Sequence, residues 1–178
     1  MPEITREKAP LTKTVVFSHG KESGPWGLKI SRLAPVAEEL GFAVVSIDYR
    51  GIDDPAERVR MLLAGCPQDS GMVVLAGSSM GGSVSLAAAA TIRPAGLFLM
   101  APAIGLPGYP DLPPLSHLPP TVIVHGWDDD IVPPGPVMDF ACRHRLELAM
   151  VPDGHTLENS LDFLTDRFRF FLAQLSRS

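Results

Sequence analysis

A serine stands between glycines directly after an apolar run of this sequence. Residues 73–83 read VVLAGSSMGGS, so Ser79 is the centre of a Gly-x-Ser-x-Gly pentad that begins at Gly77 and ends at Gly81. When a strand precedes such a pentad and a helix follows it, the chain bends sharply and leaves the serine hydroxyl exposed. A flexible turn would explain the same residues without any catalytic role. The choice depends on whether the chain also supplies a base and an acid.

A base and an acid are required because a serine hydroxyl is a poor nucleophile at neutral pH. The base takes its proton, and a third group fixes the tautomer of the base. Acidic residues occur in HGWDDD at 125–130, and a histidine follows in DGH at 153–155. The sequence contains five histidines that could serve as the base: His19, His117, His125, His144 and His155.

The same residue types do not predict a metal site. Three consecutive aspartates at 128–130 cannot all converge on one ion, and no spaced partners follow them. We expect Asp128 and Asp130 to be solvated turn residues. Cys66 and Cys142 are too few and too far apart for a zinc site or a disulfide framework, so they are expected to be reduced thiols. The sequence therefore implies no metal ion and no organic cofactor.

Short apolar runs rich in β-branched residues alternate with segments of helical apolar spacing. Continuous runs of this kind are typical of strands covered on both faces. The runs lie at 14–17, 42–47, 72–76, 96–100, 121–124 and 146–151. The helical segments lie at 28–40, 55–64, 80–92, 135–142 and 158–175. This alternation predicts a single α/β domain over residues 1–178, with a mainly parallel six-stranded sheet and helices on both faces.

The predicted sheet would gather the reactive residue types at one edge. In open parallel sheets, ligands bind outside the carboxyl ends of the strands. The pentad follows the third run, the acidic segment 125–130 follows the fifth, and the segment 153–155 follows the sixth. A serine, an acid and a histidine therefore arrive at the same edge of the sheet.

The sequence resembles the α/β-hydrolase family from about residue 14 to residue 175. The motifs that carry the resemblance are FSHGKESGP at 17–25, GSSMGG at 77–82, HGWDDDIVPP at 125–134 and DGH at 153–155. They occur in the family's order of serine, acid and histidine. The resemblance implies that Ser79 is the nucleophile, Asp129 the acid and His155 the general base. It also implies an oxyanion hole formed by the backbone N–H groups of Met80 and Lys21.

The resemblance further implies a serine hydrolase that cleaves carboxylic esters or thioesters of a small or lipid-like acyl compound through an acyl-enzyme. Two alternatives stay open: a non-catalytic binding protein with the same fold, and an acyltransferase that uses the same three residues. Many relatives carry a helical cap after the fourth strand, where this chain has only a proline-rich loop at 103–120, so no cap domain is expected. Apolar residues of this loop could line an acyl groove or seal the top of the sheet: Ile104, Leu106, Tyr109, Leu112 and Leu115.

The composition argues against a nucleic-acid-binding protein and against an integral membrane protein. The chain has 178 residues, of which 46% are hydrophobic and 20% charged, and this is enough for a substantial core. Its net charge is −5 and it has no basic cluster, so nucleic acid is not an expected partner. No apolar stretch approaches the roughly 20 residues needed to cross a bilayer, and the first residues lack the apolar region of a signal peptide. We therefore expect a cytoplasmic protein without an integral membrane segment; the sequence leaves its oligomeric state open.

Overall fold

Strands and helices alternate along the chain in the computed structural model, which describes residues 12–107, 109 and 118–177. The strands are β1 (Lys13–Ser18), β2 (Phe42–Ile47), β3 (Met72–Ser78), β4 (Gly96–Met100), β5 (Thr121–Gly126) and β6 (Glu147–Val151). The helices are α1 (Leu28–Glu39), α2 (Pro55–Gly65), α3 (Met80–Ile92), α4 (Pro134–His144) and α5 (Leu161–Leu175), with a 3₁₀ turn, η1 (Glu158–Ser160), before α5.

The six strands form one parallel sheet in the order β2-β1-β3-β4-β5-β6. The chain first moves outward from β1 to β2, then returns to β3 on the other side of β1 and continues from there to β6. Connections therefore diverge between β1 and β3, which makes this the topological switch point where a crevice opens at the carboxyl ends. The end of β3 that carries the pentad borders this crevice.

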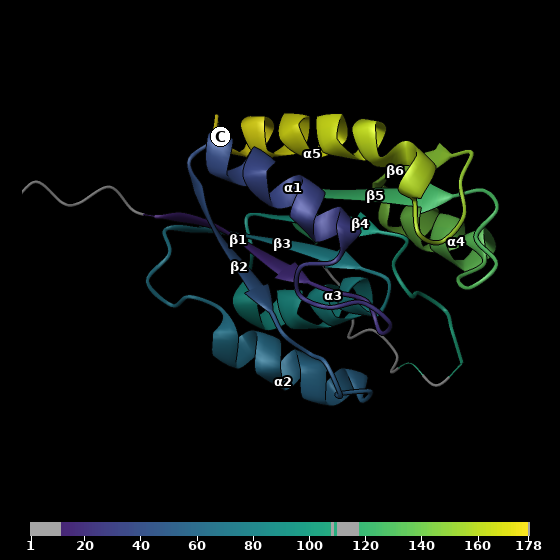
Figure 1. The fold of residues 1–178 in the computed structure, drawn as a ribbon, viewed down its shortest axis with the longest axis horizontal. Helices are drawn as coiled ribbons and strands as arrows, with labels where there is room; N and C mark the ends of the chain where they lie inside the picture. The colour runs from purple at the N-terminus through teal and green to yellow at the C-terminus, as the bar shows by residue number, and fades with distance from the viewer. Residues whose placement is uncertain (1–11, 108, 110–117, 178) are drawn as a thin grey trace, which may run out of the picture.

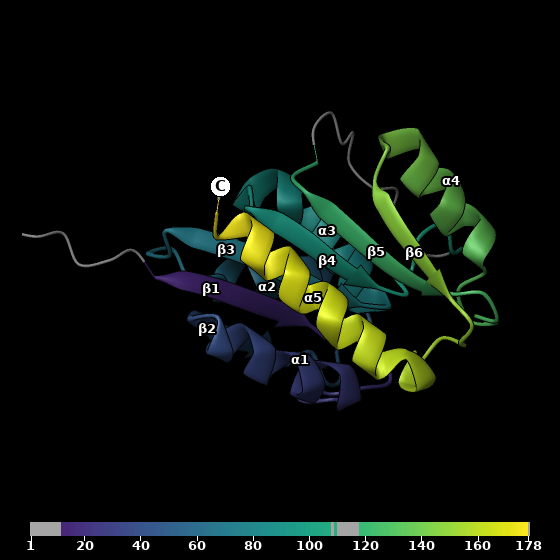
Figure 2. The same ribbon diagram turned by 90° about the horizontal axis from the view of Figure 1, so that it is seen from above.

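Helices cover both faces of the sheet (Figures 1 and 2). Helices α1 and α5 pack side by side on one face, where three phenylalanines of α5 and β4 contact one another: Phe98, Phe168 and Phe171. Helices α2, α3 and α4 contribute to the second core, on the opposite face. Helix α3 is buried over most of its length because its residues 83–90, SVSLAAAA, are small and largely apolar. Two apolar layers thus hold the sheet between them and fix the strand ends.

The predicted fold class is confirmed, and the expected strands and helices all form within a few residues of their expected bounds. One expectation is wrong in part: β2 and β6 are not covered on both faces. Most of their residues are only partly buried, because these strands lie at the two edges of the sheet. Across the described ranges, no helix is long and apolar enough to cross a membrane.

The proline-rich connection between β4 and β5 adds no helix among its described residues. Ile104 is buried, and Leu106 and Tyr109 pack against the core on the α2/α3/α4 side of the sheet. These three side chains therefore contribute to the core on this face of the sheet. Leu112, Leu115 and His117 lie outside the described residues.

Candidate active site

Ser79 sits on a strained bend between β3 and α3. Its backbone angles are φ 54° and ψ −120°, a conformation that costs a non-glycine residue about 1–3 kcal/mol and persists only where neighbours hold it. The neighbours here are backbone groups: the Ser79 N–H donates to Met100 O at 2.9 Å, and Ser79 O accepts from the N–H groups of Gly82 at 2.9 Å and Ala103 at 3.0 Å. The bend is therefore fixed from both of its sides.

The glycines of the pentad provide room for this bend. A Cβ on Gly77 would lie 2.6 Å from the carbonyl carbon of Gly81, and a Cβ on Gly81 would lie 2.5 Å from the carbonyl carbon of Ser18. Both contacts are with backbone atoms, which cannot rotate away as the end of a long side chain can. Glycine at positions 77 and 81 lets α3 start directly against β3 and the end of β1.

The side chains of Ser79, His155 and Asp129 form a continuous hydrogen-bonded series. The Nε2 atom of His155 lies 2.9 Å from Ser79 Oγ, and its Nδ1 atom lies 2.8 Å from Asp129 Oδ2. An ionised carboxylate only accepts hydrogen bonds, so Nδ1 carries the proton and Nε2 is free to accept the proton of the serine hydroxyl. The structure thus brings together the three residues that the sequence singles out, and their roles in catalysis stay a prediction.

Asp129 is the buried member of its acidic triplet, whereas Asp128 and Asp130 are exposed. Its Oδ1 atom accepts hydrogen bonds from the backbone N–H groups of Ile131, at 3.0 Å, and Val132, at 2.7 Å. Its Oδ2 atom faces the histidine. The carboxylate is therefore held in one rotamer by the backbone of its own turn. Within the described part of the chain, no group of three or more His, Cys, Asp or Glu residues is placed to hold a metal ion.

A second histidine, His125, lies beside the same carboxylate. Its Nε2–H donates to Val132 O at 2.9 Å and lies 3.3 Å from Asp129 Oδ2. Burial lowers the pKa of His125 below its usual 6.5, so the ring is neutral at physiological pH. The sequence offered His125 only as one of five possible bases and did not predict its contact with the acid. Only the local spacing of four residues between His125 and Asp129 hinted at it.

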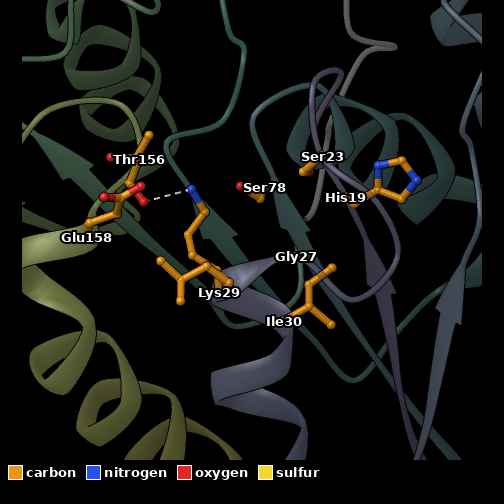
Figure 3. Close-up of a pocket in the computed structure, with 9 residues that line it drawn as sticks. His19, Ser23, Gly27, Lys29, Ile30, Ser78, Thr156 and Glu158 are labelled. Atoms are coloured by element: carbon orange, nitrogen blue, oxygen red, sulfur yellow. Dashed lines mark hydrogen bonds between the residues drawn. The ribbon is translucent and has the colours of Figure 1, made fainter.

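The loop that carries His155, residues 152–160, is anchored at two points. Leu157 is fully buried in the core between the sheet and α1/α5. Lys29, at the start of α1, donates from Nζ to Thr156 O at 2.9 Å (Figure 3). Burial lowers the pKa of Lys29, and the nearby carboxylates of Glu158, Asp129 and Asp153 oppose that shift. The sequence contains no pattern that would have revealed this tether, because 127 residues separate Lys29 from Thr156.

A cavity of about 160 Å³ opens beside the bend, between the segment that follows β1, the start of α1 and the His155 loop. Figure 3 shows Lys29, Ser78 and Glu158 around it. Its lining includes Ser78 and Thr156, which neighbour Ser79 and His155 in the sequence, but none of the three hydrogen-bonded residues.

The oxyanion hole is expected at the backbone N–H groups of Met80 and Lys21. Met80 is the first residue of α3, so its N–H has no acceptor within the helix and stands at the positive end of the helix dipole. Lys21 follows Gly20, which packs so closely on the bend that a Cβ at Gly20 would lie 3.3 Å from Ser79 Cβ. The side chain of Lys21 instead faces the exposed Asp53, at 3.7 Å. Any contribution of Lys21 to the site would come from its backbone.

The remaining histidines take other positions. His19 is buried beside the bend: its Nε2 accepts from Tyr49 N–H at 2.8 Å, so its Nδ1 carries the proton and donates to Gly20 O at 2.7 Å. Burial is the main cause that lowers the pKa of His19. His144 ends α4 and packs on the ring of Phe140. Neither is placed to accept a proton from Ser79.

A parallel α/β sheet with an acid, a histidine and a serine joined at its carboxyl edge is the architecture of the α/β hydrolases. The sequence profile of the alpha/beta hydrolase family matches residues 15–174, and the chain belongs to this family. A search of the curated proteins found no significant match.

Solved structures resemble the chain over nearly its whole length. A protein of Xanthomonas campestris pv. campestris assigned to the hydrolases of the alpha/beta superfamily is 30% identical, with a TM-score of 0.81 over 91% of this chain and 99% of that chain. Est1E from Butyrivibrio proteoclasticus, solved with ferulic acid bound, is 21% identical, with a TM-score of 0.76 over 100% and 94% of the two chains. A serine hydrolase without a lid, also from Xanthomonas campestris, is 23% identical, with a TM-score of 0.66 over 94% and 85%.

Proposed function

We propose that this protein is a serine hydrolase that cleaves carboxylic esters or thioesters through an acyl-enzyme on Ser79. The observation that carries the proposal is the hydrogen-bonded series itself, with Ser79 Oγ 2.9 Å from His155 Nε2 and Asp129 Oδ2 2.8 Å from His155 Nδ1. The strained bend at Ser79 adds support, because a serine without a special role has no need of so costly a backbone conformation.

In the proposed first half-reaction, Ser79 Oγ attacks the acyl carbon while His155 Nε2 takes the hydroxyl proton. The new C–O bond converts the carbonyl oxygen to an oxyanion, to which Met80 and Lys21 donate from their backbone N–H groups. The bond to the alcohol or thiol then breaks, and the leaving group receives the proton from His155. Asp129 keeps the protonated imidazole oriented and stabilises its charge.

In the second half-reaction, water takes the place of the alcohol or thiol. His155 accepts a proton from the water as its oxygen bonds to the acyl carbon, and the Ser79–acyl bond then breaks. Ser79 Oγ regains a proton from His155, and the carboxylic acid leaves.

The experiment that tests the proposal compares the wild-type protein with Ser79→Ala. A panel of p-nitrophenyl esters and acyl thioesters of increasing chain length measures hydrolysis, and a fluorophosphonate probe measures nucleophile reactivity independently of substrate choice. We expect turnover and labelling in the wild type and neither in Ser79→Ala. Ser85→Ala is the matched control, because its buried hydroxyl makes no hydrogen bond to any described residue.

The same experiment separates the alternatives. A wild-type protein that neither turns over any substrate nor reacts with the probe would favour a non-catalytic binding protein. Faster release of the acyl group when a second alcohol or amine is added would favour an acyltransferase. Turnover that survives in Ser79→Ala would refute the assignment of the nucleophile.

A further inference from the structure

The guanidinium of Arg58 is buried without a carboxylate at ion-pair distance among the described residues, and Asp53 acts on its charge only from farther away. Arg58, on α2, is 1% exposed, and it takes part in none of the ion pairs among the residues that the structure describes. Burying a charge without a partner of opposite sign is costly, and arginine stays charged at all physiological pH values. Such an arrangement needs a compensating set of contacts.

The compensating contacts are with backbone carbonyls and one aromatic ring. Arg58 Nε donates to Ile52 O at 2.6 Å, and Nη1 donates to His19 O and Gly20 O, both at 3.2 Å. The guanidinium also lies over the ring of Tyr49, 5.2 Å from its centroid. Two of the three carbonyls belong to the segment that precedes Lys21, so the buried charge is fastened to one side of the proposed oxyanion hole.

These contacts fix the direction of one peptide group. Gly20 O is held by two donors at once, Arg58 Nη1 at 3.2 Å and His19 Nδ1 at 2.7 Å. The described residues contain no cis peptide bond, and in a trans peptide the carbonyl and the N–H point in opposite directions. Because Gly20 O points toward Arg58 and His19, the N–H of Lys21 points away from them. Gly20 itself packs against Ser79, since a Cβ added at Gly20 would lie 3.3 Å from Ser79 Cβ, so the Gly20–Lys21 peptide begins beside the nucleophile.

We propose that Arg58 is a positioning residue that holds the Gly20–Lys21 peptide so that the Lys21 N–H donates to the oxyanion. This inference rests on the proposed serine hydrolase function. Arg58 acts through the peptide and touches no reacting atom. Its charge also polarises the Gly20 carbonyl, which strengthens the N–H at the other end of the same peptide as a donor.

The test compares Arg58→Met with Arg58→Lys and with Arg60→Met as a matched control. Met removes the charge and all donors but keeps an unbranched apolar side chain, and Lys keeps the charge without the guanidinium fork. Arg60 lies on the same helix, is exposed and forms its ion pair among the described residues with Glu57. We expect Arg58→Met to lower kcat about 10²-fold, the typical effect of losing one oxyanion donor. Arg58→Lys should fall between it and the wild type, and Arg60→Met should match the wild type.

Two measurements distinguish positioning from general weakening of the fold. The KM of Arg58→Met should stay within about threefold of the wild type, and its affinity for a trifluoromethyl ketone, which forms a tetrahedral oxyanion, should fall by about the same factor as kcat. The affinity for the carboxylate product should not change. A folded Arg58→Met variant with unchanged kcat, or with a higher KM and an unchanged kcat, would overturn the proposal.

A measurement that needs no turnover keeps this inference separate from the proposed function. Amide hydrogen exchange should be faster at residues 20–23 in Arg58→Met than in the wild type, with unchanged exchange in β5 and β6. Equal exchange in the two proteins would overturn the positioning role even if the wild type hydrolyses esters. Inactivity of the wild type would instead overturn the hydrolase. If Arg58→Met does not fold, the kinetic and the hydrogen-exchange measurements are made on Arg58→Lys.

Discussion

Replacing Asp129 with asparagine should reverse the tautomer of His155. Oδ1 of the aspartate accepts hydrogen bonds from two backbone N–H groups, and Oδ2 accepts one from the Nδ1–H of His155. Asparagine has one acceptor oxygen. If that oxygen faced His155, the amide NH₂ would point at two backbone donors, and losing each buried hydrogen bond costs about 1–3 kcal/mol. The oxygen should therefore stay with the backbone, which leaves the NH₂ group facing His155.

An NH₂ group opposite Nδ1 can only donate, so His155 must carry its proton on Nε2. In that tautomer Nε2 cannot accept the proton of Ser79 Oγ, although the two atoms stay about as close as the 2.9 Å of the wild type. A tautomer error of this kind lowers kcat about 10⁴-fold, which corresponds to about 5 kcal/mol in the activation free energy. The free energy of unfolding should change little by comparison, because the two backbone hydrogen bonds persist.

The assay is steady-state hydrolysis of the best p-nitrophenyl ester, with the rate of fluorophosphonate labelling as a second measure. Asp128→Asn and Asp130→Asn are matched controls, since both side chains are exposed in the same turn. We expect both to stay within about threefold of the wild type, as surface substitutions usually do. The reasoning would be refuted if Asp129→Asn retained more than a tenth of the wild-type kcat, or if either neighbour proved the more damaging substitution.

Two further predictions concern stability and do not depend on the proposed activity. Gly81→Ala should lower the free energy of unfolding by about 1–3 kcal/mol or more, because its Cβ would overlap the backbone of Ser18. Gly135→Ala lies at a helical site where the added Cβ would have no neighbouring atom within 4 Å, so it should raise the free energy of unfolding by up to about 1 kcal/mol. Urea unfolding measures both variants, and two changes of the same sign would contradict the packing argument. Burial lowers the pKa of His19 and of His125 below 6.5, so the unfolded chain binds protons first as the pH falls. The free energy of unfolding should therefore decrease from pH 7.5 to pH 5.5, and a rise over this interval in urea titrations would count against neutral buried histidines.

Local patterns predicted the strands and the bend because each pattern depends only on residues that are close together in the sequence. The apolar runs identified the six strands, and the pentad at Ser79 located the bend, since only glycine fits the backbone contacts at Gly77 and Gly81. The strand order was not predictable in the same way. Whether β3 pairs with β1 or β2 depends on where the crossovers place each strand, and no local pattern records that choice.

The candidate site, too, was predictable from the sequence only in part. The motif order and the family resemblance pointed to Ser79, Asp129 and His155, and the structure brings their atoms within hydrogen-bonding distance. Nothing in the sequence indicated that Lys29 holds the His155 loop or that Arg58 holds the segment before Lys21.

The sequence by itself therefore determined the elements and the residues that end them, because periodicity, glycine spacing and turn chemistry act over a few residues. Only the tertiary structure decided which distant groups meet. Arg58 and Gly20 are 38 residues apart, and His155 and Ser79 are 76 residues apart. Such contacts depend on the packing of α1, α2 and the loops against one shared sheet. Long-range packing sets the direction of a carbonyl or the burial of a charge, and local propensity carries no information about either.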